Sequence, residues 1–334
     1  GSEMCIRDRP VGNRLVVHLR NTGDDAHDLR IGGAHSGRLA PGEEAEVDAG
    51  VIGANIQGYC TVAGHKQMGM TFDVVATGAD ADERPGHTAT APTAVPPVAG
   101  ATLPSAVDPT LPPRIDERVH RATFTVTEVP LEVAPGLWQT RWTFNGASVG
   151  PTLRGKVGDE FEITLVNEGS MGHSIDFHAG VLAPDEPMRT IQPGERLVYR
   201  FKAERAGIWM YHCSTMPMST HIAAGMHGAV VIEPDGLDPV DHEYVMVQSE
   251  LYLGNAAHSA DDATEINADK LAAETPDRVV FNGVAHQYEQ HPLQVRAGER
   301  VRFWVLDAGP NRALSFHVVG CLLYTSDAAD DSLR

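Results

Sequence analysis

Three stretches of the chain share one pattern of apolar and polar positions. Each has a glycine turn, then a run in which apolar and polar residues alternate, and then an Asn or Asp near a second glycine; the copies cover residues 11–23, 157–169 and 297–309. Alternation with a period of two predicts a strand, and the closing residues predict a tight turn. The copies begin about 140 residues apart, a domain's length rather than a short repeat's. The pattern therefore predicts an all-β protein of three related domains.

The composition between these copies predicts where the domains end. Residues 78–114 are rich in Ala, Thr and Pro, which favours an extended, semi-rigid linker. A second boundary is expected at the Glu-Pro-Asp-Gly-Leu stretch of residues 233–237. Helix is sparse, and only residues 263–274 are plausibly helical. We expect a partial domain at 10–77, a complete domain at 115–236 and the first part of a third at 237–320.

Both ends of the chain are expected to be artefacts. Residues 4–8 and residues 321–325 can be encoded by one DNA element in opposite orientations, and this element resembles a sequencing-library adapter. We therefore expect residues 1–9 and 321–334 to be adapter translations. On this interpretation the first and third domains are truncated and any signal peptide has been lost. Of the four cysteines, only Cys60 and Cys213 then need an explanation.

The charge of the chain narrows the classes of partner. Its 334 residues hold 26 Lys and Arg against 45 Asp and Glu, a formal net charge of -19. Such an acidic chain would be repelled by a polyanion, which argues against nucleic acid. No stretch approaches the roughly 18 consecutive apolar residues that a membrane helix needs. We therefore expect no membrane span in the visible chain.

Each of the two native cysteines belongs to a cluster with metal-ligand spacing. In the first, His27 follows the strand of residues 11–23, and Cys60, His65 and Met70 come later. One thiolate, two imidazoles and a thioether five residues after the second His form a set that selects copper and suits one-electron transfer. The second cluster keeps the offset from the preceding Asn and the His-to-Met spacing; its members are His173, Cys213, His221 and Met226.

The second cluster carries extra chemistry. His212 precedes Cys213, and His178 follows His173 with Asp176 between them. Adjacent side chains of a strand point to opposite faces, so His212 and His178 are expected to face away from the Cys213 cluster as partial ligands of a second metal. The covalent step from Cys213 to His212 is the natural electron path between the two sites.

Residues 121–320 resemble the copper-containing nitrite reductases, two-cupredoxin members of the multicopper oxidase superfamily. The resemblance rests on residues 173–180 and 211–237, where the ligand spacing, the His-Cys step and the Asp-x-His all match. It implies tandem cupredoxin-like Greek-key β-sandwiches, of which the first and third are truncated here. It also implies a type 1 copper held by His173, Cys213, His221 and Met226, a type 2 copper held by His178 and His212, and Asp176 as the proton-relaying carboxylate beside bound nitrite.

The same resemblance reaches the third domain. Residues 312–320 look like the stretch that carries the family's second catalytic histidine, which gives His317 that role and places Val319 over the substrate. In the family this domain docks on a neighbour in a homotrimer, and a third type 2 histidine would lie beyond residue 320. The N-terminal copper domain resembles the electron-donating domains fused to some members. The resemblance further implies a small redox protein as donor, a role in denitrification, and an exported, periplasmic or extracellular protein.

Two other functions compete with nitrite reduction. A laccase-like multicopper oxidase would need four His-x-His pairs for its trinuclear cluster, and the chain has His212-Cys213-Ser214 where His-Cys-His is required. A non-catalytic blue-copper electron-transfer protein would have no use for Asp176 beside His178. The remaining histidines lack partners at recognisable spacing and are expected to be solvated: His35, His87, His120, His227, His242, His258, His286 and His291.

Overall fold

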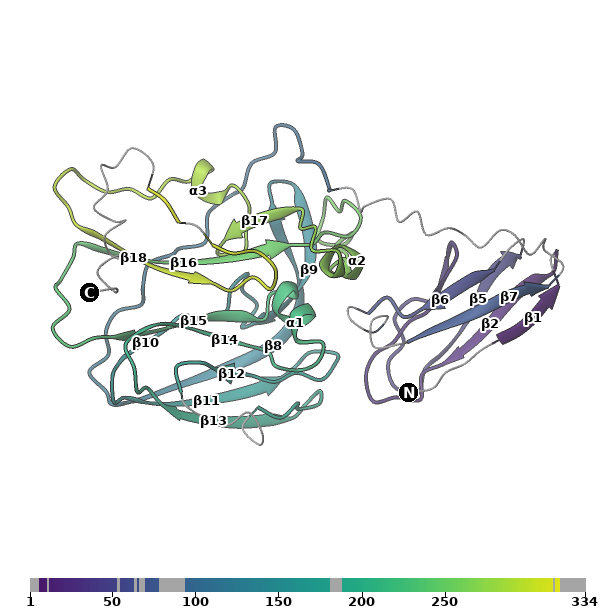
Figure 1. Ribbon diagram of the computed structural model, residues 1–334, viewed down its shortest axis with the longest axis horizontal. Helices are drawn as coiled ribbons and strands as arrows, with labels where there is room; N and C mark the ends of the chain where they lie inside the picture. Colours follow the sequence, from purple (N-terminus) through teal and green to yellow (C-terminus); the bar gives the residue numbers. More distant parts are fainter. Residues whose placement is uncertain are drawn as a thin grey trace.

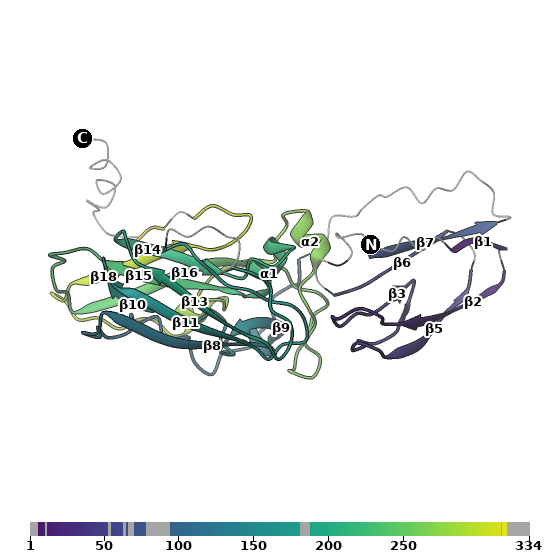
Figure 2. The ribbon, with the colours of Figure 1, turned by 90° about the horizontal axis from the view of Figure 1, so that it is seen from below.

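The chain is built mostly of strands, which form an N-terminal body and a larger body (Figures 1 and 2). The computed structural model describes residues 6–10, 12–52, 55–62, 65, 70–77, 94–180, 188–314 and 316–318. Within those residues no helix is long and apolar enough to span a membrane. The expected all-β class is confirmed, and the sandwiches are cupredoxin-like.

The N-terminal body is a sandwich of two sheets. One sheet has the order β1-β7-β6-β3-β4 and the other pairs β2 with β5. Apolar side chains from both sheets, including Leu15, Ile31, Val47 and Val74, form its core. The strands are β1 (Ile6–Pro10), β2 (Arg14–Arg20), β3 (Arg30–Ile31), β4 (Ala34–His35), β5 (Glu44–Val51), β6 (Ile56–Tyr59) and β7 (Thr71–Thr77). The backbone of β1, which lies mostly in the segment expected to be an adapter translation, pairs in parallel with β7.

The middle domain is a sandwich of two four-stranded sheets. Their orders are β10-β15-β14-β12 and β13-β11-β8-β9. Between them lies an aromatic core that includes Phe124, Trp142, Phe161, Tyr199 and Tyr211. The elements are β8 (Val119–Ala134), β9 (Leu137–Phe144), β10 (Leu153–Lys156), β11 (Glu160–Asn167), β12 (Asp176–Phe177), β13 (Arg196–Lys202), β14 (Gly207–His212), α1 (Met218–Ala224) and β15 (His227–Glu233).

The third domain contributes one three-stranded sheet in the described residues, with the order β17-β16-β18. Its elements are β16 (His242–Leu251), α2 (Ala268–Ala272), β17 (Arg278–Phe281), α3 (Gln287–Gln290) and β18 (Val301–Asp307). The helical pattern of residues 263–274 thus forms the short helix α2, which Asn267 caps by accepting a hydrogen bond from the backbone of Lys270.

The second half of the expected linker, residues 94–114, forms no helix or strand but is well packed. Val95, Leu103 and Leu111 are buried, and polar side chains of the third domain bind the backbone here: Asp277 accepts from Val95 N at 2.5 Å, and Gln287 accepts from Val107 N at 2.8 Å. The first half, residues 78–93, lies outside the described residues.

The repeated sequence pattern corresponds to a repeated structure. It forms β2, β11 and β18, one strand in each domain. After β2 the Asn21 side chain donates to Asp25 O at 2.7 Å and to Leu39 O at 2.9 Å. After β11 the Asn167 side chain makes the equivalent bonds to Met171 O at 2.8 Å and Ile191 O at 3.0 Å. These bonds fix the loop that leads to His27 in one domain and to His173 in the next.

Candidate metal centres

The most buried candidate centre is formed by His173, Cys213 and His221, which we call the Cys213 site. Their ligand atoms lie within 4.8 Å of one another, and all three residues are buried. Cys213 Sγ lies 3.3 Å from His221 Nδ1 and 4.0 Å from His173 Nδ1. Met226 is fully buried, and its backbone N donates to His221 O at 3.0 Å while its O accepts from Cys213 N at 3.1 Å. The backbone thus ties Met226, the residue expected to supply a thioether ligand, to Cys213 and His221.

Gly225 makes this arrangement possible. Cys213 directly follows β14, His221 lies in α1, and Gly225 ends that helix with φ 124°, a conformation that other residues adopt only under strain. A Cβ atom at Gly225 would lie 2.9 Å from the backbone oxygen of Trp142. The turn that brings Met226 back beside Cys213 therefore requires glycine for both conformation and space.

The electrostatics of the Cys213 site favour a thiolate. Burial opposes ionisation, yet the histidines His221 and His173 hold the pKa of Cys213 well below its ordinary value. Burial also opposes charge on His173, but Cys213 and Glu128 raise the pKa of that imidazole to about 9. Ser174 N donates to the sulfur at 3.4 Å. The thiolate is the form that binds metal, so the sulfur needs no deprotonation. A metal would instead have to displace the proton that the His173 imidazole holds at pH 7.

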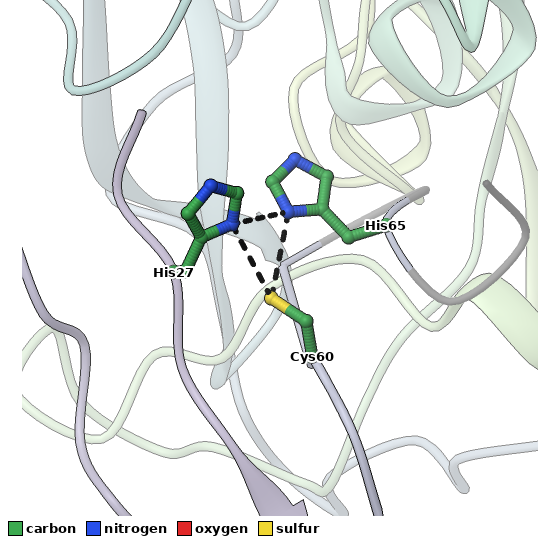
Figure 3. Close-up of side chains that lie close together, drawn as sticks. All are labelled: His27, Cys60 and His65. Carbon is green, nitrogen blue, oxygen red and sulfur yellow. Dashed lines mark hydrogen bonds between the residues drawn. The ribbon is translucent and has the colours of Figure 1, made fainter. Parts of the chain in front are cut away.

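A second centre repeats the set in the N-terminal body, formed by His27, Cys60 and His65 and called the Cys60 site. The three side chains point toward one another (Figure 3), with Sγ 3.4 Å from His65 Nδ1 and 3.9 Å from His27 Nδ1. Cys60 N donates to Met70 O at 3.0 Å and Met70 N donates to His65 O at 2.9 Å, as in the Cys213 site. Met70 is 41% exposed, whereas Met226 is fully buried.

The Cys60 site differs from the Cys213 site in charge. Burial raises the pKa of Cys60 to about 11. Burial, helped by the neighbouring His27, lowers the pKa of His65 to about 4. The metal-free Cys60 site is therefore a neutral thiol with neutral imidazoles at pH 7, and a metal would have to displace the thiol proton.

The third centre lies on the other side of β14 from Cys213 and consists of Asp176, His178 and His212, which we call the outward site. His178 Nε2 and His212 Nε2 are 3.0 Å apart. Asp176 Oδ2 lies 3.6 Å from His178 Nε2 and 3.9 Å from His212 Nε2. The His178 side chain is 44% exposed, whereas those of His212 and Asp176 are largely buried. The site therefore opens to solvent on the His178 side.

The register of the sheet builds the outward site. Asp176 on β12 is paired directly with His212 on β14, so both side chains share one face. His212 Nδ1 lies 3.0 Å from Cys213 O. Because a carbonyl oxygen can only accept, Nδ1 carries the proton, and the lone pair of the neutral ring is on Nε2, aimed at the site. His212 is thus fixed in the tautomer that a metal ligand needs.

The remaining residues singled out from the sequence are His317, Val319 and the histidines expected to be solvated. Among the described residues, the cluster that forms the outward site does not contain His317. Val319 lies outside the described residues. Of the histidines expected to be solvated, His120 and His227 are buried, which corrects that expectation. His120 Nε2 is 3.0 Å from Asp159, and His227 packs behind α1 with Nδ1 3.0 Å from Ile222 O. His87 lies outside the described residues.

Sequence reasoning missed three residues around the Cys213 site. Trp142 is fully buried, with its ring centroid 4.8 Å from that of His221 and 5.8 Å from that of His173. Glu128 Oε1 lies 3.7 Å from His173 Nε2. Glu265, in the third domain, accepts a hydrogen bond from Trp142 Nε1 at 2.9 Å. Trp142 lies two residues before a Phe-Asn-Gly stretch that recurs at residues 281–283, and this could have drawn attention to it. Nothing in the sequence marks Glu128 or Glu265.

The donor sets fit copper. A buried thiolate with two imidazole Nδ1 atoms and a thioether is the soft, trigonal set that copper electron-transfer proteins use. Two imidazole Nε2 atoms 3.0 Å apart in a solvent-open site fit a second copper that keeps a position for substrate. Sandwich fold and donor sets together define a cupredoxin-type copper protein.

Comparison with known proteins places the chain more closely. The multicopper oxidase family profile matches residues 125–236. The copper-containing nitrite reductase of Neisseria gonorrhoeae is 36% identical over 220 residues, which cover 64% of this chain and 56% of that protein. The copper-containing nitrite reductase of Pseudomonas chlororaphis is 36% identical over 198 residues, which cover 53% of this chain and 54% of that protein. The solved copper nitrite reductase of Nitrosomonas europaea has a TM-score of 0.51 and 34% identity, covering 58% of this chain and 69% of that one.

The chain therefore belongs to the multicopper oxidase family, on its copper-containing nitrite reductase branch. It spans about half the length of the curated relatives that it matches. The cofactor of this family is copper, as the sequence predicted.

Proposed function

We propose that the parent protein of this chain reduces nitrite to nitric oxide. The observation that carries the proposal is the division of two consecutive residues between two sites. Cys213 belongs to the buried Cys213 site, while His212 belongs to the outward site together with His178 and Asp176. The backbone between His212 and Cys213 therefore links the buried Cys213 site, which is suited to receiving electrons, with the solvent-open outward site, which is suited to a small anion.

The reaction needs one electron and two protons for each nitrite, and it gives nitric oxide and water. When bound, copper would carry single electrons at the Cys213 site and act as a Lewis acid toward an anionic oxygen at the outward site. His178 and His212 would be ligands of the second copper, and His173, Cys213, His221 and Met226 ligands of the first. His27, Cys60, His65 and Met70 would hold a further copper in the N-terminal body.

Asp176 is placed to handle a proton. Its carboxylate is within 4 Å of both imidazoles of the outward site and is held there by the register of β12 and β14. A carboxylate at this position can hold a proton and pass it to a departing oxygen as a general acid. We assign the second proton to His317, which in a homotrimer would serve the outward site of a neighbouring subunit.

The proposal also covers the cellular compartment of the parent protein and the source of its electrons. By analogy with the family, the parent protein is exported, and a small redox protein supplies its electrons. Thiolate copper sites such as those of Cys60 and Cys213 are usually filled outside the cytosol, which supports an exported compartment.

Two alternatives remain distinguishable from nitrite reduction. A laccase-like oxidase needs a three-copper cluster, whereas the outward site of the described chain offers two histidines and one carboxylate. A pure electron carrier would leave the outward site without metal, so it would bind two coppers per full-length chain rather than three.

The test is release of nitric oxide from nitrite by the full-length, copper-loaded protein, with a reduced donor and without oxygen. The His178→Ala variant should lose this release and keep the blue absorbance of the Cys213 site. A His258→Ala variant is the matched control, because His258 is exposed and bonds only to Gly136 O among its described partners. A protein that holds all three coppers and yet releases no nitric oxide would refute the proposal.

A further inference from the structure

Residues from all three domains meet beside the Cys213 site. Glu265 of the third domain accepts from Trp142 Nε1 of the middle domain at 2.9 Å, and its other oxygen lies 3.5 Å from Arg38 Nη2 of the N-terminal body. The side chains of Arg38 and Glu265 are 28% and 21% exposed. We call Arg38, Trp142 and Glu265 the interdomain junction. It ties the N-terminal body to the tryptophan that packs against both histidines of the Cys213 site.

Glu265 is held at this point by its own loop. The backbone N of Thr140 on β9 donates to Thr264 O at 3.0 Å. Gly254 lies so close that a Cβ atom there would be 2.6 Å from Thr264 Oγ1 and 3.2 Å from Glu265 O. The carboxylate is therefore presented by a fixed segment of backbone rather than by a long, free side chain.

The N-terminal body uses its metal-binding end for this contact. Cys60 and Val62 belong to the same buried apolar cluster as Met171, Ala223 and Ile266 of the larger body. Asp25, two residues before His27, accepts from Gly172 N at 3.1 Å. In Figure 3 segments of the larger body lie around the two imidazoles of the Cys60 site. The Cys60 site therefore lies against the α1 side of the Cys213 site, and the His221 imidazole contributes to the lowered pKa of His65.

We propose that the interdomain junction docks the N-terminal body on the histidine face of the Cys213 site, with Glu265 as the positioning residue. The occupant of this face is thus a segment of the same chain. An external redox protein is excluded from it and has to deliver electrons to the N-terminal body instead. This inference concerns docking alone and does not depend on which substrate the outward site takes.

The experiment measures docking by hydrogen exchange at residues 58–62 and 218–226 of the full-length protein, together with its maximum dimension from X-ray scattering. At pH 8, above the pKa of about 7 that burial gives Glu265, Arg38→Glu places two carboxylates against each other. It should speed exchange at both segments by about five- to tenfold and lengthen the particle, as expected for the loss of a half-buried ion pair. The charge-swapped variant, Arg38→Glu with Glu265→Arg, restores opposite charges and should return slow exchange to both segments.

The control is Arg20→Glu, which reverses an arginine paired with Glu44 at 3.3 Å on the exposed surface of the same body. It should leave exchange at both segments unchanged. The inference fails if Arg38→Glu has no effect, if Arg20→Glu has the same effect, or if the charge-swapped variant does not restore slow exchange. It also fails if the unmodified protein already exchanges rapidly at both segments. None of these readouts measures nitric oxide, so failure of docking and failure of the proposed function are separate results.

Discussion

Asp176 and His212 face each other across β12 and β14, paired in register, with Oδ2 of the carboxylate 3.9 Å from Nε2 of the imidazole. The same imidazole donates from Nδ1 to the carbonyl of Cys213. His212 is therefore fixed from one side by the thiolate residue and approached from the other by the proposed proton donor. If the proposed function holds, electron supply and proton supply converge on one ring.

The first prediction concerns this carboxylate. Asp176→Asn keeps the shape of the side chain but removes its ability to hold and release a proton. We expect nitrite turnover to fall by about 10² to 10⁴, the usual contribution of a general acid. The blue absorbance should not change, because Asp176 does not touch the Cys213 site. Loss of the blue colour in this variant would instead show that the carboxylate is structural.

The second prediction concerns the turn before Met226. Gly225→Ala introduces a Cβ at φ 124° that would lie 2.9 Å from Trp142 O. We expect a loss of more than about 2 kcal/mol in stability and a weakened blue absorbance, because strain and overlap act together. Gly236→Ala is the matched control, with φ 74° and open space around the new atom. Equal melting temperatures for the two variants would contradict the role given to Gly225.

The third prediction separates the two thiolate sites. Cys60→Ser and Cys213→Ser should each remove one copper per chain and about half of the blue absorbance, since the thiolate ligand gives these sites their affinity and their colour. The double variant should be colourless and keep the copper of the outward site. Metal analysis with absorbance spectra checks this. A Cys60→Ser protein with undiminished colour would mean that the N-terminal body binds no blue copper.

The fourth prediction follows from the ionisation of Glu265. Burial raises its pKa to about 7 despite the Arg38 guanidinium, while the carboxylates Glu128 and Asp28 add to the rise. A raised folded pKa means that this residue's contribution to stability is fully present below its unfolded value near 4.5. That contribution is lost as the pH rises through 7.

Glu265→Gln, which stays neutral, should therefore match the unmodified protein at pH 4.5 and exceed it at pH 8. The difference should reach at most roughly 3 kcal/mol. Melting temperatures of both proteins across this range provide the measurement. A gap that does not change with pH would show that Glu265 is not the titrating group.

Local patterns predicted the strands and the metal clusters because each is a property of nearby residues. The alternating runs became β2, β11 and β18, and the spacing from Cys213 to Met226 is closed by bonds within that one segment. The opposite orientations of Cys213 and His212 follow from the strand period alone.

The sequence could not predict contacts between distant segments. Glu265 meets Arg38 and Trp142 only because three domains pack together, and no spacing encodes that. His227 looked like a surface residue, yet it is buried because α1 folds over it and its ring nitrogen reaches Ile222 O. The Pro-rich composition predicted an extended linker at residues 78–114, and this stays a prediction. It gave no sign that Asp277 and Gln287 would bind that backbone to the third domain.

The binding of the Val95 and Val107 backbone to the third domain limits how far the N-terminal body can move from the histidine face of the Cys213 site. Only residues 78–94 separate the end of β7 from the bound backbone at Val95, a span of at most roughly 65 Å for fully extended chain. A tether of this length keeps the two faces at an effective concentration of about millimolar. A contact too weak to hold two free proteins together is then enough to keep the face occupied.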